Sequence, residues 1–286
     1  MNSAFDLQLS HPSGPLAHTV QGLWAASVSP VAADDGVSQA AVNKGAANKG
    51  AVNKGAVNKD RVEKTLFADA GSGIGFLLAG EAAVDGHALP QGVIMLPINK
   101  HADRLSLSPG CILAGVRFQP GMGYKLFGRH YQQLTRLAES EDQCFSLYPL
   151  LGDLQRCNNN PQRIERLYHW ANQHCLLEQQ ADSIAQLLTL INNDSVLSQL
   201  SHQIDVSQRQ AERLFKTRLG MTAKNYQRII RIRQAIAEIK ANPEHSLADI
   251  AANSGFSDQA HMTREFKAIA RMTPGKLNHR HNNGVK

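Results

Sequence analysis

The sequence predicts an α+β protein with a small N-terminal β-sandwich or β-barrel domain, a helical connector and an all-α C-terminal domain. A length of 286 residues suits two domains better than one. Between Gly71 and Phe127, short apolar runs are separated by Gly and Pro, which is typical of antiparallel strands. Beyond Tyr131 the apolar residues follow the helical period. We place the three parts at residues 1–135, 136–180 and 181–282.

The expected β domain contains the runs IGFLLAG, GVIMLP and CILAGVRF, with turn signals such as Asp85-Gly86 and Pro109-Gly110. A small β-barrel can hold one small ligand in its mouth. A metal enzyme would need clustered His and carboxylate residues, whereas His87 and His101 stand alone. No nucleotide-binding or nucleophile-elbow motif is present either. We therefore expect no metal, no cofactor and no catalytic residue.

A five-residue unit recurs between Val42 and Asp60 as VNKGA, ANKGA, VNKGA and VNKD. A period of five matches neither a helix nor a strand, so the unit cannot place its small apolar residues on one face. We expect a disordered insertion over residues 40–60. The alternative is that its lysines grip phosphates.

The sequence also predicts a cytoplasmic address. No run of eighteen apolar residues is present, and the first residues lack a secretion signal. The four cysteines are widely spaced and include no C-x-x-C pair, so we expect free thiols rather than a disulfide framework or a zinc site.

The basic excess is confined to the last third of the chain. Residues 195–286 hold 15 Lys and Arg against 7 Asp and Glu, a balance of +8, whereas residues 1–194 have a balance of −2. Such an asymmetry favours a polyanion partner for the C-terminal domain.

Two similar units lie within this basic third. In the first, VLSQLSHQ is a short helix, Asp205 stands at a turn, and Ser207 is the expected N-cap of SQRQAERLFKTRLG. In the second, LADIAANS precedes Gly255 at the turn and Ser257 as the expected N-cap, fifty residues after Ser207. A short helix, a tight turn and a helix with a polar, Arg-bearing face form a helix-turn-helix, whose second helix enters the DNA major groove.

The segment AKNYQRIIRIRQAIAEIKAN between the units predicts one long helix that packs against both. About eighteen helical residues span ~27 Å. This length is close to the ~34 Å between successive major-groove faces, so one rigid helix could set two readers on the same side of a duplex. An ordinary bundle of amphipathic helices is the alternative interpretation, and the repetition of the unit argues against it.

Several spaced motifs resemble the AraC/XylS family of bacterial transcription regulators: VSQRQAERLFKTRLGMT, YQRIIRIRQA, LADIAANSGFSDQAHMTREFK and MTP. The resemblance covers residues 181–280 and implies a cytoplasmic, nucleoid-associated regulator that binds double-stranded promoter or operator DNA without spanning a membrane. It places the β domain in the sensor position, with a small-molecule effector or homodimerisation as alternatives, and it implies RNA polymerase as a partner. The chain departs from the family at Met262, Ala270, Arg271 and Leu277, where the family usually has an aromatic residue, an aromatic residue, a glycine and a tyrosine.

The resemblance and the exposed helix faces together select ten candidate DNA-contacting residues: Gln208, Arg209, Glu212, Arg213, Lys216, Gln259, Ala260, His261, Arg264 and Lys267. Arginine can bond guanine O6 and N7 bidentately, whereas Lys216 and Lys267 suit phosphates. Glu212 either accepts from cytosine or, as we prefer, orients a neighbouring arginine. His261 either contacts a base or stays solvated.

One rival hypothesis comes from another functional class, namely a DNA-repair enzyme or other enzyme fused to the same DNA-binding module. A methyl-accepting repair enzyme of this kind needs a reactive cysteine in a Pro-Cys-His context. Cys111 lies in PGCIL, and the other three cysteines have no such flanks either. We therefore prefer a regulator to an enzyme.

Overall fold

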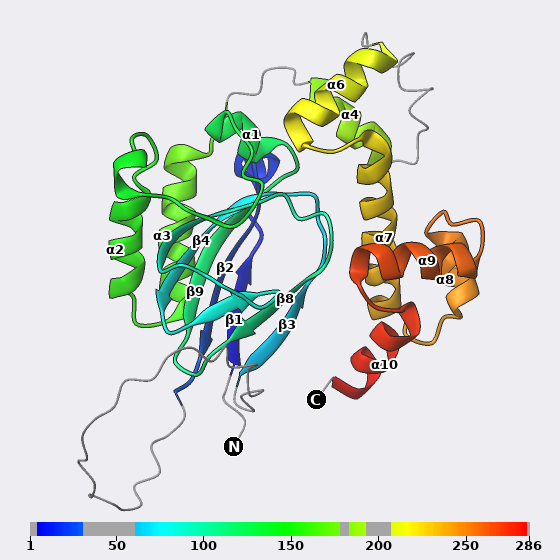
Figure 1. The fold of residues 1–286 in the computed structure, drawn as a ribbon, viewed down its shortest axis with the longest axis horizontal. Helices are drawn as coiled ribbons and strands as arrows, with labels where there is room; N and C mark the ends of the chain where they lie inside the picture. Colours follow the sequence, from blue (N-terminus) through cyan, green and yellow to red (C-terminus); the bar gives the residue numbers. More distant parts are fainter. Residues whose placement is uncertain (1–4, 31–60, 178–182, 193–206, 285–286) are drawn as a thin grey trace, which may run out of the picture.

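The structure is a computed structural model that describes residues 5–30, 61–177, 183–192 and 207–284. The repeat insertion at 40–60, the first helix of the first predicted unit and its turn at Asp205 lie outside the described residues. The described part consists of an N-terminal β domain flanked by helices and a C-terminal helical domain (Figure 1).

The β domain contains two antiparallel sheets, as the sequence predicts. The larger sheet has the strand order β1 (Phe5–Ser10), β2 (Val20–Val28), β9 (Ile112–Phe118), β4 (Gly73–Ala79), β7 (Gly92–Leu96) and β10 (Thr135–Arg136). The smaller sheet has the order β3 (Val62–Leu66), β8 (Asp103–Leu107), β5 (Ala82–Val84) and β6 (His87–Ala88). Short 3-10 helices cover Gly14–His18 and Glu139–Glu141.

Alternate residues of the central strands are buried in two different hydrophobic cores, one on each face of the larger sheet, because successive side chains of a strand point to opposite faces. In β4, Ile74 and Phe76 belong to the core under the helices, whereas Leu77 belongs to the core with the smaller sheet. At Gly115 of β9, an added Cβ would lie 2.4 Å from Ile74 O and 2.4 Å from the Trp24 indole. A glycine is therefore required for the Trp24 ring to lie over this strand.

Helices α2 (Leu147–Arg156) and α3 (Asn160–His174) cover one face of the larger sheet, next to the short helix α1 (Met122–Phe127) (Figure 1). The α3 face that contains Leu167, Trp170 and Ala171 is buried in the same core as Ile74 and Phe76. The Trp170 indole N–H also donates to Phe145 O at 2.6 Å. These two helices come from the segment that the sequence analysis treats as a connector, and they form a layer of the β domain.

The helical domain is built around one long helix, α7 (Ala223–Ala241). Helices α4 (Ser183–Asn192) and α6 (Gln208–Leu219) pack near its N-terminal end. Helices α8 (Leu247–Asn253), α9 (Gln259–Ala270) and α10 (Pro274–Gly284) pack along its C-terminal half (Figure 1).

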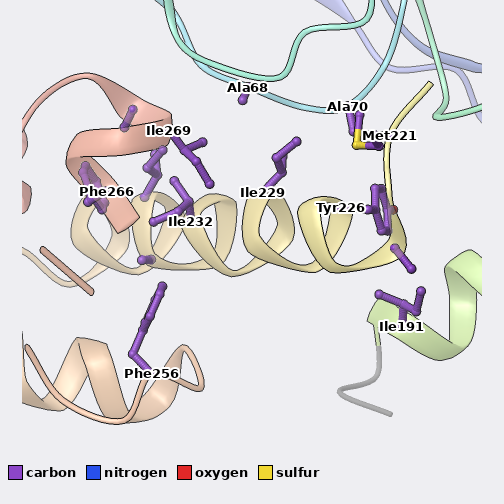
Figure 2. Close-up of a cluster of buried hydrophobic side chains, with 14 of the residues drawn as sticks. Ala68, Ala70, Ile191, Met221, Tyr226, Ile229, Ile232, Phe256, Phe266 and Ile269 are labelled. Carbon is purple, nitrogen blue, oxygen red and sulfur yellow. The ribbon is translucent and has the colours of Figure 1, made fainter. Parts of the chain in front are cut away.

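The isoleucine-rich face of α7 connects all parts of this domain through one core, as predicted (Figure 2). Ile229 and Ile232 of α7 share that core with Ile191 of α4 and with Phe266 of α9. Ala68 and Ala70 of the β domain join the same cluster, and Figure 2 shows them along one side of α7. The β domain is therefore packed directly against the helix that connects the two units.

Candidate nucleic-acid interface

Helix α6 is the second helix of the first predicted unit. Its N-cap is Ser207, as expected, and the Ser207 hydroxyl accepts from Gln210 N at 3.3 Å. The Gln210 side chain in turn accepts from Ser207 N at 2.8 Å, which completes a capping box. Gly220 ends the helix with a left-handed backbone (φ 58°), a conformation that glycine adopts without strain.

The predicted contact residues of α6 all lie on its exposed side: Gln208, Arg209, Glu212, Arg213 and Lys216. The opposite side contains Ala211, Phe215 and Leu219, which are buried in the helical core. The partner of Glu212 differs from our preferred one, because its Oε1 accepts from the Gln208 amide at 3.4 Å rather than from an arginine.

Helix α9 is the second helix of the second unit, and the predicted N-cap Ser257 is wrong by one residue. Asp258 is the N-cap, and its Oδ1 accepts from His261 N at 2.6 Å. Ser257 precedes the cap, and its hydroxyl donates to Asp258 Oδ2 at 3.1 Å. A carboxylate and a hydroxyl are both good N-caps, so composition alone did not distinguish them. Gly255 does stand at the turn, with φ 71°.

The two N-caps, Ser207 and Asp258, are fifty-one residues apart, so each residue of α6 corresponds to the residue of α9 that follows it by fifty-one positions instead of fifty. Phe215 then corresponds to Phe266, and both side chains are completely buried. Arg213 corresponds to Arg264 and Lys216 to Lys267, and these four side chains are exposed. Arg209 corresponds to Ala260, so the first helix has an arginine near its N-terminus where the second has a methyl group.

The remaining predicted residues of α9 also lie on its solvent side. Gln259, Ala260, Arg264 and Lys267 are exposed, whereas His261 is half-buried. Met262 and Phe266 face the core, as expected. The two helices therefore each present a polar face with an arginine and a lysine, and neither face is covered by the β domain.

An ion pair that the sequence analysis did not anticipate joins α9 to α7. Arg228 Nε donates to Glu265 Oε2 at 2.5 Å, and both side chains are partly buried, at 35% and 19% exposure. Arg228 also donates to Asn225 Oδ1 at 3.4 Å. Because this pair lies between the two helices, it helps to fix the direction of α9 relative to α7.

At three of the four positions where the chain departs from the family pattern, the side chain is buried in the core of the helical domain. Met262, Ala270 and Leu277 are at most 6% exposed, so smaller or non-aromatic side chains fill this core. The fourth departure is Arg271, which ends α9 in a left-handed conformation (φ 53°) where a glycine would be unstrained. Its guanidinium donates to the carboxylate of Asp85 and lies 3.7 Å from Asp103 Oδ1.

The β domain contacts the C-terminal ends of both helices through the β7–β8 loop (residues 97–102). At α6, Lys100 Nζ donates to Gly220 O at 2.8 Å. At α9, Ala102 N donates to Ile269 O at 2.7 Å, and Arg271 reaches Asp85 and Asp103 beside it. One short loop is thus bonded to the last carbonyl groups of two helices that α7 separates.

Further contacts strengthen the α6 end of this interface. The His130 ring nitrogen Nε2 is 2.7 Å from Thr217 O, and the Arg218 guanidinium lies over the Tyr124 ring, 5.6 Å from its centroid. A cavity of about 10 Å³ lies behind His130, and its walls include Met95, Leu96 and Ile98 at the base of the β7–β8 loop. This volume holds about one water molecule.

All four cysteines are free thiols, as predicted. Burial raises the pKa of Cys111 to about 11 and that of Cys175 to about 12. A nucleophilic cysteine needs the opposite, a lowered pKa and solvent access. Among the residues that the structure describes, no group of His, Cys, Asp or Glu side chains is arranged to hold a metal ion, and no helix is long and apolar enough to cross a membrane.

Comparison with known proteins supports this interpretation of the C-terminal domain. Residues 200–280 match a family model described as a helix-turn-helix domain. This domain is an AraC-type helix-turn-helix domain. The match confirms the helix-turn-helix prediction for this part of the chain, so the C-terminal domain is a DNA-binding domain. No curated protein matches the chain.

Several solved structures are similar to the chain over most of its length. ToxT from Vibrio cholerae O395 is 13% identical with a TM-score of 0.44, over 77% of this chain and 96% of that one. A ToxT structure from Vibrio cholerae strain SCE256, described as bound to an unsaturated fatty acid, is 14% identical with a TM-score of 0.42, over 80% and 98%. The AraC-like transcriptional activator CuxR is 9% identical with a TM-score of 0.22, over 97% and 86%.

Proposed function

We propose that this regulator reads two successive major grooves of one DNA duplex with α6 and α9, and that the β domain controls how the two helices are placed. The ten candidate contact residues are the side chains we assign to this interface. The observation that carries the proposal is that two helices of equal length present exposed arginine and lysine side chains from one rigid support.

The dimensions of the support suit this arrangement. Helix α7 has 19 residues and is therefore about 28 Å long. Successive major-groove faces are ~34 Å apart, and the two reading helices add their own width to the length of α7. The buried isoleucines of α7 make it part of the core, so its length is fixed when the domain folds.

The β7–β8 loop is the element through which we propose that the β domain acts. It bonds to Gly220 O and Ile269 O, which lie at the C-terminal ends of α6 and α9. The N-terminal residues of a recognition helix approach the bases, so the loop holds both readers at the ends that point away from the DNA. A shift of this loop would change the spacing or tilt of the two readers without touching the DNA.

Two signals could move the loop, a small-molecule effector or dimerisation through the β domain. The cavity of about 10 Å³ behind His130 lies at the base of the loop, and ligand sites usually occupy about 300–1,000 Å³. An effector that enters here must therefore displace Met95, Leu96 or Ile98, which would move the loop. The unsaturated fatty acid named for one ToxT structure makes unsaturated fatty acids the first ligands to try.

The two signals are separable by experiment. A long-chain unsaturated fatty acid that raises the melting temperature of the full-length protein and changes its DNA affinity would favour an effector. A concentration-dependent change of mass in analytical ultracentrifugation, without added ligand, would favour dimerisation.

We further propose RNA polymerase as a partner and the nucleoid in the cytoplasm as the location, since a regulator of transcription meets both at the promoter.

The central proposal is tested with the full-length protein and the DNA that flanks its own gene. Arg209→Ala and Arg264→Ala should each weaken binding to the selected site by about 5- to 150-fold while changing non-specific binding little, since a bidentate contact to guanine is worth about 1–3 kcal/mol. Lys216→Ala should weaken both kinds of binding alike and reduce the salt dependence by about one phosphate contact. Equal, sequence-independent losses from all three variants would contradict base reading by the arginines.

A further inference from the structure

The imidazole of His261 is held in one orientation by two contacts of its ring, and the backbone of the same residue is held by a third. Its Nδ1 is 3.1 Å from Ser257 Oγ. The ring packs edge-on against Phe256, with centroids 5.6 Å apart and an interplanar angle of 90°. Its own backbone N donates to the N-cap carboxylate of Asp258. The ring of a histidine held in this way cannot rotate freely, so each of its two nitrogens faces a fixed direction.

The direction of the hydrogen bonds in this network follows from Asp258. Its carboxylate accepts from the backbone N–H of His261, and this contact lowers the pKa of Asp258, so the group is ionised at neutral pH. An ionised carboxylate only accepts hydrogen bonds, so Ser257 Oγ must donate its single hydrogen to Asp258 Oδ2 at 3.1 Å. The hydroxyl can then meet His261 Nδ1 only as an acceptor.

These hydrogen bonds assign the tautomer of the neutral imidazole. Nδ1 carries the hydrogen and donates to Ser257 Oγ, which leaves Nε2 with its lone pair. Within the described part of the chain, Nε2 of His261 has no hydrogen-bond partner, and the residue is half-buried between the exposed Gln259 and Arg264. His261 is the third residue of α9, where recognition helices contact base edges.

We propose that His261 is a specificity-determining residue that accepts a hydrogen bond from an exocyclic amino group in the major groove, either N6 of adenine or N4 of cytosine. Guanine and thymine present only acceptors at the corresponding positions, so a neutral Nε2 lone pair cannot bond to them. Ser257 and Asp258 act as positioning residues, because they set which ring nitrogen carries the hydrogen. The inference depends on the proposed function, in which α9 is one of the two readers.

The first reader provides an internal comparison. Gln210 occupies the position equivalent to His261, and its side chain is used to bond Ser207 N in the capping box. The amide of Gln210 is thus engaged with its own helix, and we expect no base preference to depend on it. A Gln210→Ala variant is therefore the matched control for His261→Ala.

The experiment is a selection from a randomised double-stranded DNA library by the full-length protein at pH 8, above the range in which imidazoles usually titrate. One position of the second half-site should favour adenine or cytosine on one strand by about three- to tenfold, the size of a single net hydrogen bond. His261→Ala should abolish this preference, and Gln210→Ala should leave it unchanged. Ser257→Ala should reduce it and admit guanine or thymine, because the imidazole is then free to adopt the other tautomer.

Other outcomes would overturn the inference. Guanine or thymine at the His261-dependent position in the wild-type protein would mean that Nε2 carries the hydrogen. An unchanged motif in His261→Ala, while Arg264→Ala still alters the same half-site, would mean that α9 reads DNA without His261. A protein that selects no motif at all would instead contradict the proposed function, so the two failures are distinguishable.

Discussion

The two helices that we propose as DNA readers are equal in length and similar in packing, but they end differently. Each has 12 residues and buries one phenylalanine completely, Phe215 in α6 and Phe266 in α9. Helix α6 ends at Gly220, and the β domain bonds to the carbonyl oxygen of that glycine. Helix α9 ends at Arg271, whose side chain forms ion pairs with two aspartates of the β domain.

This difference indicates two ways to attach a reader to the β domain. The contact at Gly220 uses a backbone carbonyl, so it depends on the left-handed backbone that glycine adopts there without strain and not on a side chain at that position. The contact at Arg271 needs an arginine in a left-handed conformation that costs roughly 1–2 kcal/mol for an L-residue. The strain is offset by the ion pairs with Asp85 and Asp103, and this offset explains why an arginine can stand where the family usually has a glycine.

The largest expected effects test whether the two units are equally well packed. Phe215→Ala and Phe266→Ala should each lower the free energy of unfolding of the helical domain by about 3–5 kcal/mol, because each removes a completely buried ring. Urea denaturation followed by circular dichroism measures both. The exposed Arg213→Ala should change it by less than about 0.5 kcal/mol. A loss below about 1 kcal/mol for one phenylalanine would mean that its unit is loosely packed.

The ion pair between α7 and α9 should make the second reader more sensitive than the first to a single isosteric change. Glu265→Gln should lower the free energy of unfolding by about 1–2 kcal/mol, between the values for exposed and buried pairs, because it leaves Arg228 partly buried without its charge partner. Amide hydrogen exchange should quicken in α9 and not in α6. The control Glu212→Gln alters an exposed side chain that bonds only to Gln208 among its described contacts. Equal effects of the two variants would contradict a special role for the pair.

The two N-caps should respond differently to acid. Ser207→Ala should cost about 1 kcal/mol at any pH, because a hydroxyl cap does not titrate. The folded pKa of Asp258 is lowered, chiefly by the backbone N–H of His261, so its contribution is complete above the unfolded pKa and is lost as the pH falls through the folded value.

As the pH falls below the ordinary aspartate pKa of about 4 and through the lower folded pKa of Asp258, we therefore expect the first turn of α9 to fray while that of α6 persists. The amide signals of His261 and Gln210, followed by NMR from pH 6 to pH 3, measure the two caps separately. Loss of both signals at the same pH would contradict a separate titration at Asp258. An Asp258→Asn variant, which keeps an N-cap without an acid, should remove the pH dependence of the His261 amide.

At the interface with the β domain, Arg271→Gly is expected to have only a small effect on stability. Relief of the left-handed strain and loss of the exposed ion pairs are of similar size and opposite sign, so the free energy of unfolding should change by less than about 1 kcal/mol. The interface should nevertheless loosen at one end only. Hydrogen exchange at Ala102 N should quicken, because this amide donates to Ile269 O beside Arg271.

Lys100→Met is the matched variant at the other end of the β7–β8 loop, because it removes the bond to Gly220 O and keeps the length of the side chain. It should leave the exchange of Ala102 N unchanged and loosen the contact at α6. If Arg271→Gly quickened exchange at both ends equally, the two attachments would form a single cooperative contact instead of two separate ones.

Local patterns were sufficient for much of the helical domain. Phe215, Phe266 and four of the five isoleucines of α7 are buried as their spacing predicts, because a helical period places them on one face, whereas Ile230 is partly buried. The Ser207 cap was likewise predicted from residue type. The cap of α9 was displaced by one residue because Ser257 and Asp258 are both good N-caps and only the backbone conformation distinguishes them.

Contacts between distant residues could not be predicted in this way. Lys100 and Gly220 are 120 residues apart, and Asp85 and Arg271 are 186 apart. The one available signal was the arginine at a position where the family usually has a glycine, which marks a backbone that needs a compensating contact. No local pattern in the sequence indicated that Asp85 is the partner of Arg271. The packing of α2 and α3 on the sheet was missed for the same reason. The apolar face of a helix shows that the face is buried, but it does not show which other element covers it.

The sequence by itself determined which residues are apolar, how they are spaced and where basic charge is concentrated, and these properties select a helix-turn-helix domain with two exposed reading faces. Only the tertiary structure decided how the β domain contacts the C-terminal ends of α6 and α9 and which contacts the ring of His261 makes. The physical reason is the separation along the chain over which each interaction acts. Burial and capping act over a few residues along the chain, whereas a hydrogen bond between domains exists only after both domains have folded and docked.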